Sequence, residues 1–120
     1  MSQQVSGLLL NAAKNKMLND WRAVGYSIAA TTSTETSRSN NVAVTFNAAA
    51  NGKIELSTSV SLTINSGSEG ANAISKILLF PTGAGLGAKN IEFTLAEAIS
   101  FPDGGSLVVN SLSVELDDPA

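Results

Sequence analysis

Acidic side chains are the residues of this chain that could do chemistry. Glycoside hydrolysis needs two carboxyl groups facing each other across a sugar ring, and four residues could supply them: Glu92, Glu97, Asp103 and Glu115. Nothing in their spacing selects two of the four. Glu92 and Glu115 fall on the polar side of alternating segments, where a charged side chain is normally solvated. We therefore interpret these carboxylates as solvated charges on sheet faces.

Metal ligands are scarce in this sequence. It has no His and no Cys, so the usual ligands of transition metals and many common nucleophiles and bases are missing. Asp103, Asp117 and Asp118 could offer oxygen ligands to Ca²⁺, but no Asp-x-Asp-x-Asp loop with a distal Glu is present. The sequence predicts a protein that is not an enzyme, with no catalytic, cofactor-binding or metal-binding residues.

A glycine-rich segment, Gly83-Ala-Gly-Leu-Gly87, follows an apolar run, as phosphate-binding loops do. A phosphate loop leads into a helix N-terminus, where free N–H groups meet the anion. Here the next residues are Lys89-Asn-Ile-Glu-Phe93, whose alternation is typical of a strand. We expect a turn or bulge at this point instead of a nucleotide site.

Trp21 could stack on a sugar ring, as in a carbohydrate-binding module. However, it recurs at i+4 spacing with Val5, Leu9, Ala13 and Met17, which is the apolar stripe of an amphipathic helix. We expect Trp21 to belong to the core. A carbohydrate-binding β-sandwich module remains the alternative function.

The apolar stripe predicts an N-terminal helix at about residues 6–22. Ser6 can cap its start, and Gly25 lies where a left-handed residue after a helix is expected. The side away from the stripe carries polar residues: Asn11, Lys14, Asn15 and Asn19. We expect the stripe to cover an end or a face of a sheet, with docking on another subunit as the alternative.

A β-hairpin is predicted around Asn51-Gly52, which favours a turn with positive φ at both central residues. The segment Val42 to Phe46 precedes this turn. Lys53 to Asn65 follows it as one long strand or two collinear ones, with apolar residues on one side: Ile54, Leu56, Val60, Leu62 and Ile64.

The remaining segments read as strands separated by turns. A first strand alternates from Val24 to Ala29, and the polar segment from Thr31 to Asn41 is expected to be a surface loop. Further strands are predicted at 74–80, 91–95, 99–101, 107–109 and 112–116. The predicted fold is mainly β: an antiparallel β-sandwich of about seven to eight strands at about 24–117, with one N-terminal α-helix, in a single domain over 1–120.

Composition excludes some partners and favours assembly. The net charge of −3, with one Trp and one Tyr, argues against nucleic-acid binding. No apolar run approaches the roughly 20 residues of a membrane span, so we expect a soluble protein made in a cytoplasm, with no membrane partner. Charged residues make up 14%, against roughly 25% in typical domains. Such a weakly charged surface suits packing against neighbours and leaves sheet edges poorly protected.

Several segments follow one another in a distinctive order along nearly the whole chain. They are the helix Leu10-Asn-Ala-Ala-Lys-Asn-Lys-Met-Leu18, the strand Val24 to Ala29, a loop with Glu35 and Arg38, the hairpin Val44-Thr-Phe-Asn-Ala-Ala-Ala-Asn-Gly52, the strand and turn Ile77 to Gly87, and the closing segments Phe101-Pro-Asp-Gly-Gly-Ser-Leu107 and Leu112-Ser-Val-Glu-Leu116. This order resembles small bacteriophage virion structural proteins of the tail-fibre-like or capsid-decoration type. The chain departs from the pattern in the Thr/Ser-rich loop, where an Asp-Pro and a Gly-Gly-Tyr-Ala-Arg run would stand, so no role is carried over to Arg38.

The resemblance implies a non-enzymatic virion structural protein assembled in the host bacterial cytoplasm. It would be a self-associating accessory subunit, a homotrimer or homodimer, that docks on other virion proteins such as the major capsid or tail proteins. It could serve as a capsid decoration or cement protein, or as a tail-fibre or tail-tip module. The absence of coiled-coil heptads and of a collagen-like shaft favours an accessory bound to a larger surface.

Overall fold

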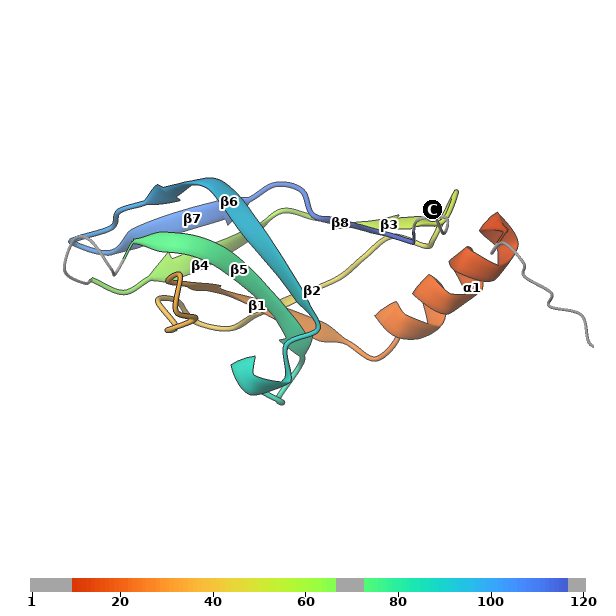
Figure 1. The fold of residues 1–120 in the computed structure, drawn as a ribbon, viewed down its shortest axis with the longest axis horizontal. Helices are drawn as coiled ribbons and strands as arrows, with labels where there is room; N and C mark the ends of the chain where they lie inside the picture. Colours follow the sequence, from red (N-terminus) through yellow and green to blue (C-terminus); the bar gives the residue numbers. More distant parts are fainter. Residues whose placement is uncertain (1–9, 67–72, 117–120) are drawn as a thin grey trace, which may run out of the picture.

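The computed structural model describes residues 10–66 and 73–116. Its described part is mainly β, with eight strands in antiparallel sheets and one α-helix near the N-terminus, as predicted (Figure 1). The elements are α1 (Asn11–Arg22), β1 (Tyr26–Thr31), β2 (Val42–Val44), β3 (Lys53–Glu55), β4 (Val60–Ile64), β5 (Ile74–Pro81), the 3-10 helix η2 (Leu86–Ala88), β6 (Ile91–Ile99), β7 (Gly105–Val109) and β8 (Ser113–Glu115).

The strands form one four-stranded sheet and two ribbons. The sheet has the order β2-β1-β5-β6, and the ribbons pair β4 with β7 and β3 with β8. Figure 1 shows the β4-β7 ribbon beside the larger sheet, whereas the β3-β8 ribbon extends towards α1 at the far end of an elongated molecule. The core contains alternate residues of both layers, among them Ile28, Ile77 and Leu79 from the sheet and Leu62 and Ile64 from the ribbon.

The centre of the sheet is buried on both faces. All six residues of β1 are buried, and in β5 the consecutive residues Leu78, Leu79 and Phe80 are fully buried. Successive side chains of a strand point to opposite faces, so such a run requires cover on both sides. The segment that contains η2 contacts β5, and the Ser27 and Thr82 hydroxyls are 2.9 Å apart. This confirms the prediction that the apolar run ending at Pro81 is a core strand.

The polar segment from Thr31 to Asn41 was predicted as a surface loop, and this was wrong for part of it. Thr31, Thr32, Arg38 and Ser39 are buried. The Ser39 hydroxyl accepts from the Ala30 N–H and donates to a carbonyl, each at 2.8 Å. Hydroxyl groups that find backbone partners can be buried at little cost.

α1 begins at Asn11 within the described residues, and it ends at Arg22 as predicted. Ser6, Val5 and Leu9, which the sequence places in the helix, lie outside the described residues. The predicted orientation of the helix is wrong. Its buried residues are Lys14 and Leu18.

Backbone donors in the segment before β3 explain this orientation. Asn15 Oδ1 accepts from the Gly52 N–H at 2.8 Å, and Asn19 Oδ1 accepts from the Ala49 N–H at 2.9 Å. Arg22 Nη1 donates to the Phe46 carbonyl at 3.1 Å. Part of the polar side of α1 therefore faces the protein, because that segment offers backbone groups that need partners.

The Asn51-Gly52 turn is confirmed, since both residues have positive φ, 55° and 75°. Ala50 and Lys53 exchange two backbone hydrogen bonds across it, at 2.9 and 3.0 Å. The hairpin pairing continues beyond the turn, where Phe46 and Leu56 form an antiparallel bridge. The regular strands on either side also take other partners: β2 pairs with β1, and β3 pairs with β8. The predicted stretch from Lys53 to Asn65 is accordingly two strands, β3 and β4, in different ribbons.

Two predicted strand boundaries are corrected. Val24 precedes β1 and is 64% exposed, because the chain turns at Gly25 with a φ of 89° before pairing begins at Tyr26. Ile99 belongs to the long strand β6, where it pairs with Ile74 of β5, instead of starting a separate strand with Phe101.

Candidate functional site: an uncovered apolar side

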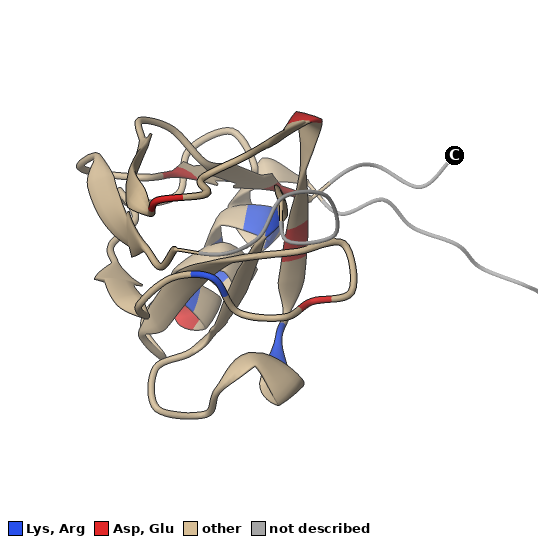
Figure 2. Cartoon of the chain, turned by 90° about the vertical axis from the view of Figure 1, so that its left-hand side faces the viewer, with Lys and Arg blue, Asp and Glu red and all other residues tan. Residues whose placement is uncertain are grey.

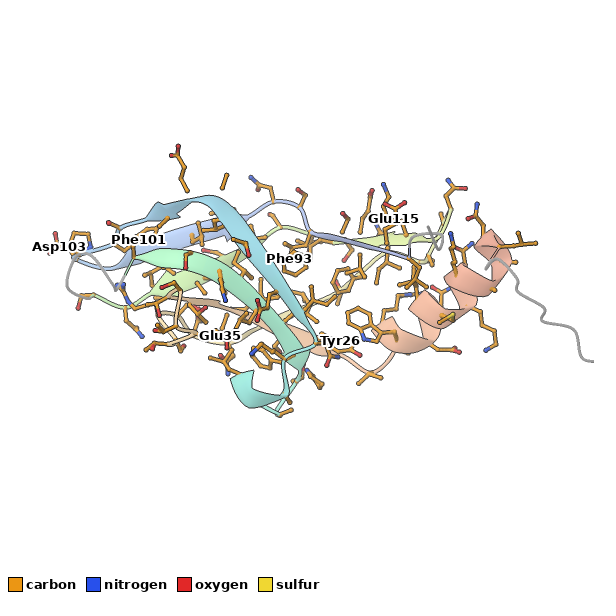
Figure 3. The ribbon with its side chains drawn as sticks, viewed as in Figure 1. Tyr26, Glu35, Phe93, Phe101, Asp103 and Glu115 are labelled. Carbon is orange, nitrogen blue, oxygen red and sulfur yellow. The ribbon has the colours of Figure 1, made fainter. Side chains whose placement is uncertain are left out.

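The four acidic candidates are not brought together as a facing pair. Figure 3 shows Asp103 at one end of the molecule and Glu115 towards the other. Glu92 lies in β6 with its carboxylate 3.5 Å from Lys76 Nζ, and Glu97 is exposed further along the same strand. Such a distribution does not hold a sugar between two carboxylates.

Of the three residues considered as calcium ligands, one lies in the described part of the chain. Asp103 is exposed in the turn before β7, whereas Asp117 and Asp118 lie outside the described residues. Within the described ranges 10–66 and 73–116, no three His, Cys, Asp or Glu residues are grouped so that they could hold a metal ion. Over the same ranges, no helix combines the length and the apolar character of a membrane span.

The glycine-rich segment forms a turn and the short helix η2, as expected for a loop before a strand. Gly83 and Gly85 have φ of 86° and 81°, which glycine adopts readily. The backbone then enters β6 through an extended Lys89, with φ of −54° and ψ of 139°. Three residues of 3-10 helix do not form the long helix N-terminus that a phosphate loop requires.

An ion-pair cluster connects this loop to the polar loop after β1. Lys89 Nζ lies 2.7 Å from a Glu35 carboxylate oxygen, and Lys76 Nζ lies 3.6 Å from the other. Both lysines also approach Glu92, at 3.5 and 3.7 Å. The hydrogen bond from Lys89 is the main reason that the pKa of Glu35 falls to about 2. Two acids and two bases compensate each other, so this cluster joins two loops instead of forming a charged site.

Trp21 contacts other aromatic side chains. Its ring stacks on Tyr26 with centroids 4.0 Å apart and an interplanar angle of 22°, and Phe46 lies 6.1 Å away. The side chain is half-buried against the core, as predicted. One ring face is thereby occupied within the chain, which leaves less of it for a sugar.

Apart from Trp21, the described part of the helix face expected to be buried is instead exposed. Met17 and Val24 are 50% and 64% exposed, and Leu10, just before α1, is 72% exposed. Ala13, on the same predicted stripe, is also exposed. Large apolar side chains exposed together mark interaction surfaces more often than scattered ones do.

A groove of about 250 Å³ lies between this helix and the sheet. Its lining is apolar except for one amide, and consists of Met17, Leu18, Trp21, Asn90, Ile91, Val114 and Leu116. The groove therefore joins the exposed face of α1 to the first residue of β6.

Two further grooves follow β6 where it borders the β7-β8 segment. One of about 240 Å³ is lined by Phe93, Leu95 and Leu107 among others, and one of about 560 Å³ is lined by Phe93, Leu112 and neighbouring polar residues. We call this region the β6 seam: Ile91, Phe93 and Leu95 on one side, and Leu107, Leu112 and Val114 on the other. All six side chains are half-buried.

The exposed face of α1, the groove beside it and the β6 seam together make up what we call the uncovered side. It can offer apolar contact and free strand edges, but little polar chemistry. Figure 2 shows that charged residues are few along the whole described ribbon and that both signs are present. Such a surface is suited to binding another protein surface. Sequence reasoning missed the β6 seam because alternation in β6 indicates which face is apolar, but not whether a second layer covers it.

Comparison of the chain with protein-family models, with curated protein sequences and with solved structures finds no match.

Proposed function

We propose that this chain is a non-enzymatic structural protein of a bacteriophage particle, a self-associating accessory subunit that docks on the particle surface. It would act as a capsid decoration or cement protein, or as a tail-fibre or tail-tip module. The virion assignment derives from the order of segments that resembles small phage virion proteins. The structure supplies one supporting observation, the uncovered apolar side.

That apolar side supports docking because it brings several apolar surfaces together. Met17 of α1 and Ile91 of β6 line one groove, and Phe93, two residues further along β6, lines the next. Apolar surface left in water costs about 25 cal/mol per Å² relative to burial, so a partner that covers it gains free energy. A protein whose work is to assemble would carry such a surface.

In this proposal the face of α1 contacts another virion protein. Leu10 and Met17 supply the apolar contacts, and the ion pair between Lys16 and Asp20, at 2.9 Å, lies exposed beside them. The partner is a protein with an apolar patch, because the helix face offers few hydrogen-bonding groups. The β6 seam remains available for contact between copies of this chain.

A carbohydrate-binding module is the second candidate, since Trp21 lines the groove beside α1. The groove contains a single polar side chain, Asn90. Sugars present many hydroxyl groups that need hydrogen-bond partners when they are buried. An apolar protein surface fits this groove better than a sugar does.

Immunogold electron microscopy of phage particles tests the proposal, with an antibody raised against the purified chain. Gold over the heads would support the decoration role, and gold at the tail would support the tail role. If neither intact nor partly disrupted particles are labelled, the virion assignment is wrong. Titration of Trp21 fluorescence with oligosaccharides would then examine the alternative, for which a saturable change is expected.

A binding experiment tests the role of the helix face. Particles that lack the protein are incubated with wild-type chain or with Met17→Glu, which places a charge on the apolar face. Wild-type chain should bind and the variant should be lost on washing. Ser33→Glu is the matched control, because Ser33 is exposed in the loop after β1. Equal binding of both variants would contradict this role.

A further inference from the structure

The outer edge of β6 is unpaired within the described part of the chain. β6 pairs with β5 along one edge, and no described strand pairs with its other edge; the β6 seam is formed by its apolar face. Unpaired strand edges are commonly protected by charged side chains, especially Lys, by Pro, by bulges or by being very short. β6 has nine residues, Ile-Glu-Phe-Thr-Leu-Ala-Glu-Ala-Ile, with no Lys and no Pro. Its charged residues are Glu92 and Glu97, and its pairing with β5 shifts register after Thr94, so Ile91 to Thr94 form the regular part of this edge.

The first half of β6 has the form of a strand that lacks a neighbour. Ile91, Phe93 and Leu95 are half-buried along the seam, whereas Glu92 and Thr94 are exposed on the other face. Ile91 to Thr94 pair regularly with β5, so their backbone geometry suits a further antiparallel strand. A partner strand here would satisfy the free backbone groups and cover the apolar row at once.

We propose that the partner is a second copy of this chain, and that two β6 strands pair antiparallel about a two-fold axis at Phe93. The inference rests on the self-association in the proposed function and names its surface. The two four-stranded sheets would join edge to edge in one isologous dimer.

In this register the residues of β6 in one copy are complementary to those of β6 in the second copy. Ile91 comes opposite Leu95 of the second copy, and Phe93 comes opposite its own equivalent, so apolar side chains meet on the seam face. On the exposed face Glu92 comes opposite Thr94, which avoids a pair of like charges.

Neighbouring registers are worse. An axis at Glu92 would place the two Glu92 side chains opposite each other, and like charges there are destabilising. An axis at Thr94 would place Ile91 opposite Glu97, an apolar residue against a charge. An axis between two residues would set the apolar row against the exposed one. The charge and apolar pattern therefore selects the axis at Phe93.

The first test is the mass of the chain against concentration, by analytical ultracentrifugation. The wild-type mass should rise from 12.3 kDa to twice that value. Thr94→Glu sets Glu opposite Glu92 of the second copy at two symmetric places and should weaken the dimer about ten-fold. Within its own chain position 94 pairs with Lys76, so the monomer tolerates the new charge.

Two variants serve as controls for Thr94→Glu. Thr94→Gln places a long polar side chain without charge at the same two sites and should retain the dimer. Ser61→Glu adds the same charge as Thr94→Glu at an exposed position of β4 and should behave as wild type. Equal weakening by Thr94→Glu and Thr94→Gln would contradict the charge effect.

The second test reads the register by disulfide cross-linking, which the natural absence of Cys makes clean. Directly opposite residues have Cβ atoms about 5 Å apart and diagonal ones about 7 to 8 Å, and a disulfide requires the shorter distance. A mixture of Glu92→Cys and Thr94→Cys chains should form covalent dimers far more readily than either chain alone.

Each other outcome overturns the inference. A mass that stays at 12.3 kDa shows that no such dimer forms. A trimer is incompatible with a single two-fold interface, and efficient cross-linking of Glu92→Cys alone indicates another register. These failures can be distinguished from failure of the virion assignment. If the chain is a monomer but antibody against it labels phage particles, only the dimer is rejected. If the chain is a dimer but no particles are labelled, only the virion assignment is rejected.

Discussion

The central strand β5 and the edge strand β6 of the four-stranded sheet differ in how completely they are covered. In β5, Leu78, Leu79 and Phe80 are fully buried, with cover on both faces. In β6, the next strand, Ile91 and Phe93 are only half-buried although they belong to the same sheet. The difference arises because η2 and the β4-β7 ribbon enclose the centre, whereas grooves open along β6. We infer that β1 and β5 stabilise the fold, and that β6 and α1 are available for contacts.

The largest expected effect comes from comparing Phe80 of β5 with Phe93 of β6. Phe80→Ala removes a fully buried ring and should lower the free energy of unfolding by about 3 to 5 kcal/mol. Phe93→Ala removes a half-buried ring and should cost clearly less. Urea denaturation of both variants at low protein concentration measures this. Equal losses of unfolding free energy would show that β5 and β6 are covered alike.

A glycine at the junction of α1 and the hairpin gives the next largest effect. Gly52→Val must adopt a φ of 75°, and its Cβ would lie 2.9 Å from Lys14 Cδ. We expect the free energy of unfolding to fall by about 1 to 3 kcal/mol from the backbone strain, with a further loss from displacement of Lys14.

Two control variants separate these causes, and thermal denaturation measures all three. Gly83→Val has a similar φ of 86° with nothing within 4 Å, so it should show the strain alone. Gly87→Val has neither strain nor contact and should be nearly neutral. A Gly52→Val variant as stable as Gly87→Val would argue against the described packing of α1.

The ion-pair cluster around Glu35 should make stability depend on pH. The pKa of Glu35 is about 2 in the folded chain, below its ordinary value of 4.5, because Lys89 donates to it. A lowered folded pKa contributes stability above about pH 4.5, and this contribution is lost as the pH falls towards 2.

Melting temperature against pH, for wild type and for Glu35→Gln, tests this dependence. The difference between the two proteins should be largest above about pH 4.5 and should shrink towards pH 2. The effect is modest, since Glu35 is partly exposed and salt screens such pairs. A constant difference across this range would assign the effect to packing instead of charge.

The smallest effect on stability is expected on the uncovered side. Met17→Ser should change the free energy of unfolding by no more than about 0.5 kcal/mol, because half of the side chain is already exposed. Leu18→Ser, one residue later and buried, is the matched comparison and should be strongly destabilising. Similar losses would mean that Met17 belongs to the core and not to a docking face.

Local patterns were sufficient for several elements. The positive φ of Asn51 and Gly52 follows from the preference of this dipeptide for one turn type. The run before Pro81 is long and apolar, so β5 could be predicted as a core strand. Glu92 and Glu115, interpreted from the sequence as solvated charges on sheet faces, do lie at exposed positions of their strands.

Other features could not be read because they depend on distant partners. Lys14 and Asn15 face the protein only because the backbone around Gly52 lies beside α1. Arg38 is buried because its guanidinium donates to the carbonyls of Asn65 and Phe101, which are 27 and 63 residues away in the chain. Neither interaction leaves a periodic signal in the sequence.

The sequence by itself therefore determined the mainly β class, the helix near the N-terminus, the tight turn and the apolar row of most strands, since each depends on neighbours along the chain. The tertiary structure alone decided which strands pair and which apolar rows stay uncovered. Met17 and Phe93 are apolar residues in well-predicted elements, yet both are left partly open. The reason is physical: periodicity specifies the apolar face of an element, but burial depends on whether another element, or another chain, lies against that face.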